Sequence, residues 1–150
     1  MQALNYTAGR LFALFASQQN WQDRYKQLIK LASLLPNFSI NETNSPHFDH
    51  YRIEGCENTV WLKVERQPDN TFLFAADSDG RIVKGLLSVL IIVIQGKTAE
   101  QILAMDFDAL FKRLKLSSEL SESRLIGLQK ITRYLIAQVT IQTKPQTTND

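Results

Sequence analysis

The chain has 150 residues, of which 44% are hydrophobic and 21% charged, and its formal net charge is +2. This length and composition exclude an intrinsically disordered protein and predict one globular domain with its own core. Acidic and basic side chains are mixed along the sequence, so we expect neither nucleic acid nor a membrane as a partner. One cysteine and the lack of a secretory signal pattern predict a reducing, cytoplasmic location.

Two helices are predicted near the N-terminus. Residues 7–17 place apolar side chains behind Thr7, a candidate N-cap, and form the helix of an N-terminal extension that we expect over residues 1–19. In residues 20–35 the apolar side chains recur at helical spacing, and Asn20 is placed as an N-cap. We expect the proline that follows to end this helix, and an Asn- and Ser-rich loop to come next.

A small antiparallel sheet is predicted in the middle of the chain. Residues 60–65 alternate strictly between apolar and polar side chains, and a turn sequence separates them from the apolar residues 71–76. These two segments form a predicted hairpin, and residues 51–54 are a candidate third strand. With three strands paired, residues 55–59 become a connection at one end of the sheet and place Cys56 at a loop tip.

The most apolar segment, residues 82–94, is predicted to be a central helix covered on several sides. Its β-branched residues favour a strand by propensity. The capping and acidic residues 77–80 at its start and Gly96 at its end favour a helix instead. A bilayer requires about 20 apolar residues, so the segment is too short to cross one.

Three further helices are predicted from their N-terminal capping residues. Thr98 opens a capping box, and Asp106 and Ser121 are placed to cap the two helices that follow. The last helix has an apolar stripe formed by Leu125, Leu128, Ile131, Leu135 and Val139. A polar stretch with a proline comes after it, so we expect residues 142–150 to form a flexible tail.

Cys56, the only cysteine, is the most informative candidate residue. A single thiol can be a nucleophile, a sulfur carrier or one metal ligand, or it can be a small buried hydrophobic residue. His47, Asp49 and His50 lie close to it in sequence, so a metal site and a Cys-His nucleophile are both alternatives. The sequence lacks the paired cysteines typical of structural zinc sites, and it shows no evident oxyanion donor or orienting group for a Cys-His pair.

The charges beside Cys56 argue against a strongly acidic thiol. Glu54 and Glu57 flank it, and a like charge disfavours the thiolate. A sulfur acceptor needs no low pKa, because the nucleophilicity of a thiolate falls as its pKa falls. Gly55, which precedes the cysteine, is free to adopt a positive φ and set the turn.

Several blocks of the sequence resemble the SufE/CsdE family of sulfur acceptor proteins. The resemblance covers about residues 20–137, with the blocks in the family's order. The blocks are residues 21–35, 55–62, 77–79, 82–87, 120–124 and 127–128. The Cys-Glu-Asn form of the cysteine loop is more similar to CsdE than to SufE.

The resemblance implies an α+β fold of the kind found in SufE and IscU. One domain would span residues 1–150, with a small three-stranded antiparallel sheet packed against a helical layer. It also implies that Cys56 lies on a loop turned toward an apolar hollow, which would shield a persulfide until a partner draws the loop out.

The resemblance further implies a function. A PLP-dependent cysteine desulfurase would form a persulfide on its own cysteine, and Cys56 would take the outer sulfur and deliver it to a downstream sulfur acceptor protein. The recipient pathway would be iron–sulfur cluster assembly or a related one. The chain would stimulate the desulfurase as an accessory protein rather than a stand-alone enzyme, without PLP, an iron–sulfur cluster or a metal of its own. A non-covalent regulatory partner of a desulfurase and a Cys-His thiol hydrolase are the alternatives.

Beside catalytic Cys56, five residues are candidates for partner binding or loop positioning: Gly55, Glu57, Asn58, Asp79 and Arg124. Asp79 and Arg124 correspond to family positions near the cysteine loop. Their alternative roles are a helix-capping carboxylate and an arginine in a surface ion pair. Two departures from the family pattern, Thr59 and Ile126, affect the expected loop contacts but leave Cys56 in place.

Overall fold

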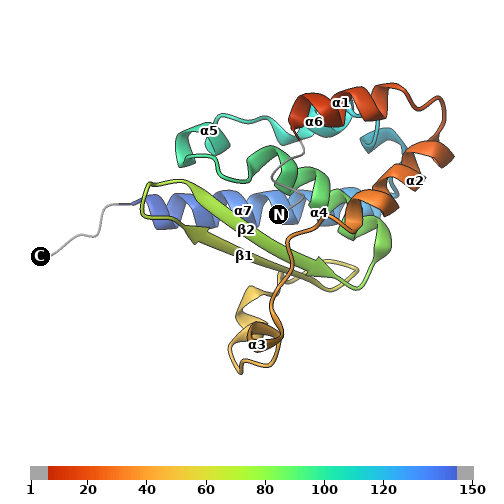
Figure 1. The fold of residues 1–150 in the computed structure, drawn as a ribbon. Coiled ribbons are helices and arrows are strands. Elements are labelled where there is room, and N and C mark those ends of the chain that lie inside the picture. Colours follow the sequence, from red (N-terminus) through yellow and green to blue (C-terminus); the bar gives the residue numbers. More distant parts are fainter. Residues whose placement is uncertain (1–6, 145–150) are drawn as a thin grey trace, which may run out of the picture.

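The protein is an α+β domain in which a β-hairpin packs against a layer of helices (Figure 1). The computed structural model describes residues 7–144, apart from the side chain of Ile40. Helix α4 packs against α2 and β2, while α7 packs against β1 and α5. The elements in chain order are α1 (Ala8–Ala16), α2 (Trp21–Ala32), α3 (Ile40–Thr43), η2 (Phe48–Tyr51), β1 (Val60–Arg66), β2 (Phe72–Ser78), α4 (Arg81–Ile94), α5 (Ala99–Leu103), α6 (Phe107–Arg113), η3 (Ser117–Glu119) and α7 (Glu122–Thr143).

The first two helices begin at the predicted caps. The side chains of Thr7 and Asn20 accept hydrogen bonds from the backbone N–H groups three residues further on, at 3.1 and 2.9 Å. Helix α2 ends at Ala32, earlier than predicted, because the backbone tightens into turn hydrogen bonds between residues three apart. The carbonyl of Pro36 then accepts a hydrogen bond from the N–H of Ala76, which places this segment beside β2.

Helix α1 is the described part of the predicted N-terminal extension. Leu11 and Phe15 are almost completely buried, and α1 packs against α4. Residues 1–6 lie outside the described part of the chain. The described helix therefore contributes to the same core as the rest of the domain.

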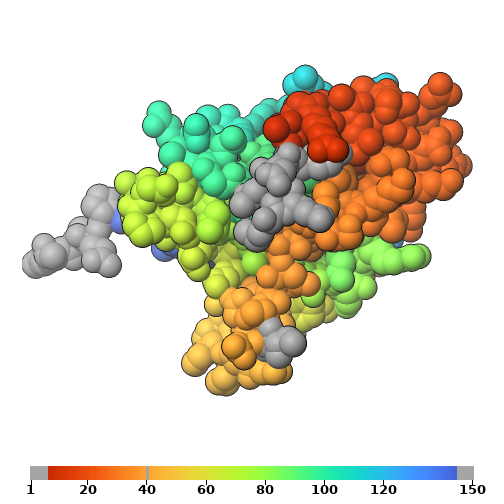
Figure 2. All heavy atoms as spheres, viewed as in Figure 1, coloured from red at the N-terminus to blue at the C-terminus, as the bar shows by residue number. Residues whose placement is uncertain are grey.

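The segment between α2 and β1 contains two short helical elements where a loop was predicted. Helix α3 falls within the predicted loop, and η2 follows it. Glu42 of α3 accepts a hydrogen bond from the ammonium of Lys63 in β1 at 2.6 Å, which ties the segment to the sheet. Helix α3 and the residues around it project from the body of the domain (Figures 1 and 2).

The sheet has two strands, so the prediction of three was wrong. The hairpin is confirmed, with Leu62 opposite Ala76 in an antiparallel register. The predicted third strand, residues 51–54, is reduced to a single bridge between Arg52 and Trp61. A 3-10 turn precedes this bridge and a turn at Glu54 and Gly55 follows it, so no longer run of residues can pair.

Helix α4 is confirmed as the buried central helix. Eleven of its 14 residues are buried. A Cβ at Gly85 would lie 2.5 Å from the carbonyl oxygen of Leu28, so α2 and α4 approach each other closely there. Of the predicted capping residues 77–80, Gly80 takes the N-cap position but has no side chain to form a cap hydrogen bond. Asp77 and Ser78 lie in β2 and pair with β1, so the expected side-chain cap does not form.

The last three helices begin at the predicted caps. Thr98 forms the reciprocal capping box of α5, and Asp106 and Ser121 accept hydrogen bonds from backbone N–H groups of α6 and α7 at 3.0 and 3.3 Å. Helix α7 buries four of the five predicted stripe residues, namely Leu128, Ile131, Leu135 and Val139. It continues to Thr143, beyond its predicted end, and residues 145–150 of the predicted tail lie outside the described residues.

Candidate functional site

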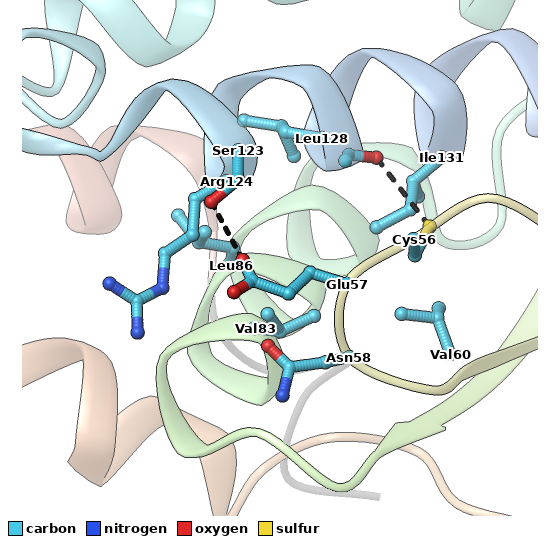
Figure 3. Close-up of a pocket in the computed structure, with 11 residues that line it drawn as sticks. Cys56, Glu57, Asn58, Val60, Val83, Leu86, Ser123, Arg124, Leu128 and Ile131 are labelled. Atoms are coloured by element: carbon cyan, nitrogen blue, oxygen red, sulfur yellow. Dashed lines mark hydrogen bonds between the residues drawn. The ribbon is translucent and has the colours of Figure 1, made fainter.

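The thiol of Cys56 faces a small hollow in the domain (Figure 3). Cys56 lies on the loop between the Gly55 turn and β1, and it is half-buried. The hollow has a volume of about 20 Å³, which is enough for about one water-sized group. Its wall comes mainly from apolar side chains of β1, α4 and α7, namely Val60, Val83, Leu86, Leu128 and Ile131.

Three successive residues of the loop are each held by α7. The ammonium of Lys130 donates a hydrogen bond to the carbonyl of Gly55 at 2.7 Å. The Cys56 thiol points at the carbonyl of Gly127, with Sγ 3.9 Å from the oxygen. The Ser123 hydroxyl donates to the carboxylate of Glu57 at 2.6 Å. Because these three α7 residues are spaced by four and three positions, they share one face of the helix.

The other end of the loop is fixed to the end of β2. The carboxylate of Asp79 accepts a hydrogen bond from the N–H of Thr59 at 3.1 Å, and the Ser78 hydroxyl donates to the carbonyl of Thr59 at 2.7 Å. Asn58 packs over Gly80, where a Cβ would lie 2.7 Å from the Asn58 side chain. Asp79 therefore contacts the loop, and its alternative role as a helix-capping carboxylate was wrong.

Burial raises the pKa of the Cys56 thiol above its ordinary value, and the nearby Lys130 ammonium opposes part of this rise. The expectation that the thiol is not strongly acidic agrees with this direction, but the physical cause differs. Glu54 pairs with Arg52 at 3.2 Å, and Glu57 is held by the Ser123 hydroxyl. Desolvation of the thiol, rather than repulsion from the flanking carboxylates, dominates the shift.

The structure brings most of the predicted site residues together. Cys56, Glu57, Asn58 and Arg124 line the hollow. Arg124 is exposed, and its guanidinium extends away from the thiol (Figure 3). It takes part in none of the ion pairs formed by the described residues, so its predicted surface ion pair is not observed there.

Sequence reasoning missed Ser123 and Lys130. Both contact the loop next to Cys56 although 66 and 75 residues separate them from their partners. Their helical spacing around Gly127, which belongs to a block of the family resemblance, was the available signal. That signal became useful only once α7 was known to lie along the loop.

The histidines near Cys56 in sequence lie on a separate structural feature. His47 is the N-cap residue of η2 and His50 lies within it, and their ring centroids are 5.3 Å apart. Among the described residues, no three side chains of His, Cys, Asp or Glu gather closely enough to hold a metal ion. The thiol is directed at the carbonyl of Gly127 rather than at an imidazole.

Within residues 7–144, no helix has both the length and the apolar character needed to cross a membrane.

The loop cysteine faces an apolar hollow, as the resemblance to the SufE/CsdE family implied, although the sheet has two strands rather than three. The chain belongs to the SufE family, because the model of that family, described as an Fe-S metabolism associated domain, matches residues 9–139.

Two relatives show which members of the family this chain is similar to. The chain is 40% identical over 131 residues to the sulfur acceptor protein CsdE of Escherichia coli K12. The aligned region covers 87% of this chain and 86% of that protein. It is 38% identical over 117 residues to an uncharacterized SufE-like protein of Haemophilus influenzae, covering 78% of this chain and 90% of that one. The similarity to CsdE that was predicted from the cysteine loop is therefore confirmed.

The fold also has a counterpart among solved structures. The solution structure of a hypothetical protein from Thermus thermophilus superposes with a TM-score of 0.71, covering 89% of this chain and 93% of that one. Sequence identity is 18%, so this comparison supports the fold alone.

Proposed function

We propose that this protein is a cytoplasmic sulfur acceptor that holds transferred sulfur as a persulfide on Cys56. The observation that supports the proposal best is the position of the thiol, which faces an apolar hollow with room for about one additional small group. The outer sulfur of a persulfide is of that size. The name of the E. coli relative, a sulfur acceptor, points in the same direction.

The sulfur donor is a PLP-dependent cysteine desulfurase that bears a persulfide on its own cysteine. The thiolate of Cys56 attacks the outer sulfur of that persulfide, forming a new S–S bond. The S–S bond of the donor breaks, and its electron pair stays with the donor cysteine, which leaves as a thiolate. The exchange conserves atoms and electrons, so it needs no separate oxidant or reductant.

The closed loop stores the thiol in a poorly reactive form. An ordinary thiol is already mostly neutral at neutral pH, and burial raises the pKa of Cys56 further, so the thiolate fraction is smaller still while the side chain faces the hollow. When the loop leaves the hollow, the thiol regains contact with water and becomes easier to ionise. The same apolar walls shield a bound persulfide until a downstream sulfur acceptor protein, in iron–sulfur cluster assembly or a related pathway, receives it.

The residues around the loop divide into two roles. Gly55, Glu57, Asn58 and Asp79 position the loop, because each lies on it or contacts it. Arg124 is exposed at the rim of the hollow, where its guanidinium can contact the desulfurase or the recipient protein.

Sulfur transfer is tested by mixing the protein with the desulfurase of its host and free cysteine, then measuring intact mass. We expect an adduct of one sulfur atom that a thiol reductant removes, and no such adduct on a Cys56→Ser variant. Stimulation of the desulfurase should require Cys56 as well. An equal adduct on both proteins would contradict the proposal. Undiminished stimulation by Cys56→Ser would instead identify a non-covalent regulatory partner.

A further inference from the structure

Of the three contacts between α7 and the cysteine loop, one joins a charged side chain to the loop backbone. Lys130 places a charged ammonium on a backbone carbonyl, that of Gly55, at 2.7 Å. Hydrogen bonds with an ionised donor are shorter and roughly twice as strong as neutral ones. The thiol contact to Gly127, with Sγ at 3.9 Å, is weak by comparison. The bond from Ser123 to the Glu57 carboxylate is charge-assisted too, but it holds a side chain, so Lys130 supplies the charged attachment to the loop backbone immediately before Cys56.

The backbone at Gly55 is shaped for this contact. Its φ is +85°, a conformation that residues with a Cβ rarely adopt. A Cβ at this position would lie 2.6 Å from the Lys130 ammonium nitrogen. Glycine thus suits the turn and leaves room for the lysine in its observed position. The Cys56 side chain cannot move far from the hollow together with this turn unless the hydrogen bond breaks.

The carboxylates near the loop are held by other partners, so the Lys130 ammonium contacts the loop backbone instead. Of the carboxylates beside Cys56, Glu54 pairs with Arg52 and Glu57 is held by the Ser123 hydroxyl. Among the ion pairs of the described residues, none includes Lys130. Two other α7 cations lie in the neighbourhood: Arg124 at the rim of the hollow and Arg133 beside Lys130 in a shallow groove.

We propose that Lys130 is a positioning residue that latches the Cys56 loop in its closed position and so limits the exposure of the thiol. Loop exposure belongs to the free protein and needs no partner. Its consequence for a stored persulfide rests on the proposed function: loss of the latch would expose the persulfide to reductants.

The latch is tested by alkylating the free, full-length protein with two reagents at the same pH. One is a bulky polymer-linked maleimide and the other is the small reagent iodoacetamide. Both react with the thiolate, so the ratio of their rates cancels any change in thiol pKa and reports access to Cys56. Three variants are compared with the unaltered protein: Lys130→Met, Lys130→Arg and Arg133→Met. Methionine and arginine are good helix formers, and thermal unfolding checks that each variant is folded.

We expect Lys130→Met to raise the bulky-to-small ratio about fivefold, the effect of losing one partly solvated hydrogen bond to a charged group. Lys130→Arg keeps a cation with N–H donors and should restore most of the closed position. Arg133→Met removes an equal charge without the bond to Gly55 and should leave the ratio unchanged. An unchanged ratio in folded Lys130→Met, or an equal rise in Arg133→Met, would overturn the proposal.

A second measurement joins the latch to sulfur transfer. Once charged with sulfur by the desulfurase, Lys130→Met should lose its persulfide to a bulky thiol reductant faster than the unaltered protein does. If the charged variant is as resistant as the unaltered protein, the latch does not protect the persulfide. If neither protein accepts sulfur, the proposed function fails while the alkylation result for the latch still stands.

Discussion

Replacing Gly55 with alanine is expected to weaken the closed position of the cysteine loop. At a φ of +85°, a Cβ costs about 1–2 kcal/mol. The new Cβ would lie 2.6 Å from the Lys130 ammonium nitrogen, so the flexible end of the lysine side chain must shift, and we expect it to lose its hydrogen bond to the Gly55 carbonyl. The lost hydrogen bond adds about 1 kcal/mol after allowance for solvent screening. Together these effects disfavour the closed loop by about 2–3 kcal/mol.

The assay is the ratio of bulky to small alkylation rates at Cys56. A change of about 2 kcal/mol raises the equilibrium constant for loop opening roughly 30-fold. The alkylation ratio stops rising once the loop is mostly open, so we expect it to increase at least about tenfold. The matched control is Gly9→Ala in α1, where a new Cβ finds no atom within 4 Å. That variant should leave the ratio unchanged. An unchanged ratio in Gly55→Ala would refute the reasoning.

A double variant tests whether Gly55 and Lys130 act through one contact. If they do, Gly55→Ala has already broken the hydrogen bond that Lys130→Met removes. The combined effect should then be smaller than the product of the two separate fold-changes. A full product would mean that the backbone strain and the lysine contact act independently.

Stability measurements test three further features. Gly85→Ala should destabilise the fold in denaturant titrations, because the clash of its Cβ with the Leu28 carbonyl, 2.5 Å away, costs about 1–3 kcal/mol and outweighs a gain of about 1 kcal/mol in helix propensity; greater stability would contradict the close approach. The hydrogen bond from Lys63 lowers the pKa of Glu42 below 4.5. The contribution of ionised Glu42 to the stability of the fold is therefore present above pH 4.5 and is lost as the pH falls further. Glu42→Gln should remove this acid dependence. Burial raises the pKa of Cys56 above 9.0. The contribution of the neutral thiol to the stability of the fold is therefore present below pH 9.0 and is lost as the pH rises through the pKa of Cys56 in the folded protein. Cys56→Ser should flatten that slope in alkaline thermal melts.

The helices could be predicted well because their signals are local. The Thr98 capping box and the Ser121 cap each act within one helical turn, and both formed as expected. Asp77 does not cap α4 because its backbone pairs with β1 as part of β2. A local sequence pattern cannot predict this pairing. Residues 51–54 failed as a strand for a similar reason, since the turns on either side leave one paired residue.

The candidate site could be predicted only along the chain. Cys56 and its place on a loop followed from the strand pattern and the glycine before it. Lys130 and Ser123 could not be predicted, because they reach the loop from 75 and 66 residues away through the packing of α7. The cause of the raised thiol pKa was missed for the same reason: burial in the hollow depends on side chains of three separate elements.

The two ends of the cysteine loop are fixed in different ways, and this difference sets how the loop can move. At one end, Thr59 is held by the Asp79 carboxylate and the Ser78 hydroxyl, both at the end of β2. At the other end, the Gly55 carbonyl is held by one long lysine side chain. A long side chain can release and rebind without disturbing the sheet, whereas the contacts of Thr59 continue the hairpin register. If the proposed latch is correct, opening breaks the Lys130 contact at Gly55 and the Ser123 contact at Glu57, while Thr59 stays fixed as the pivot and β1 and β2 remain paired.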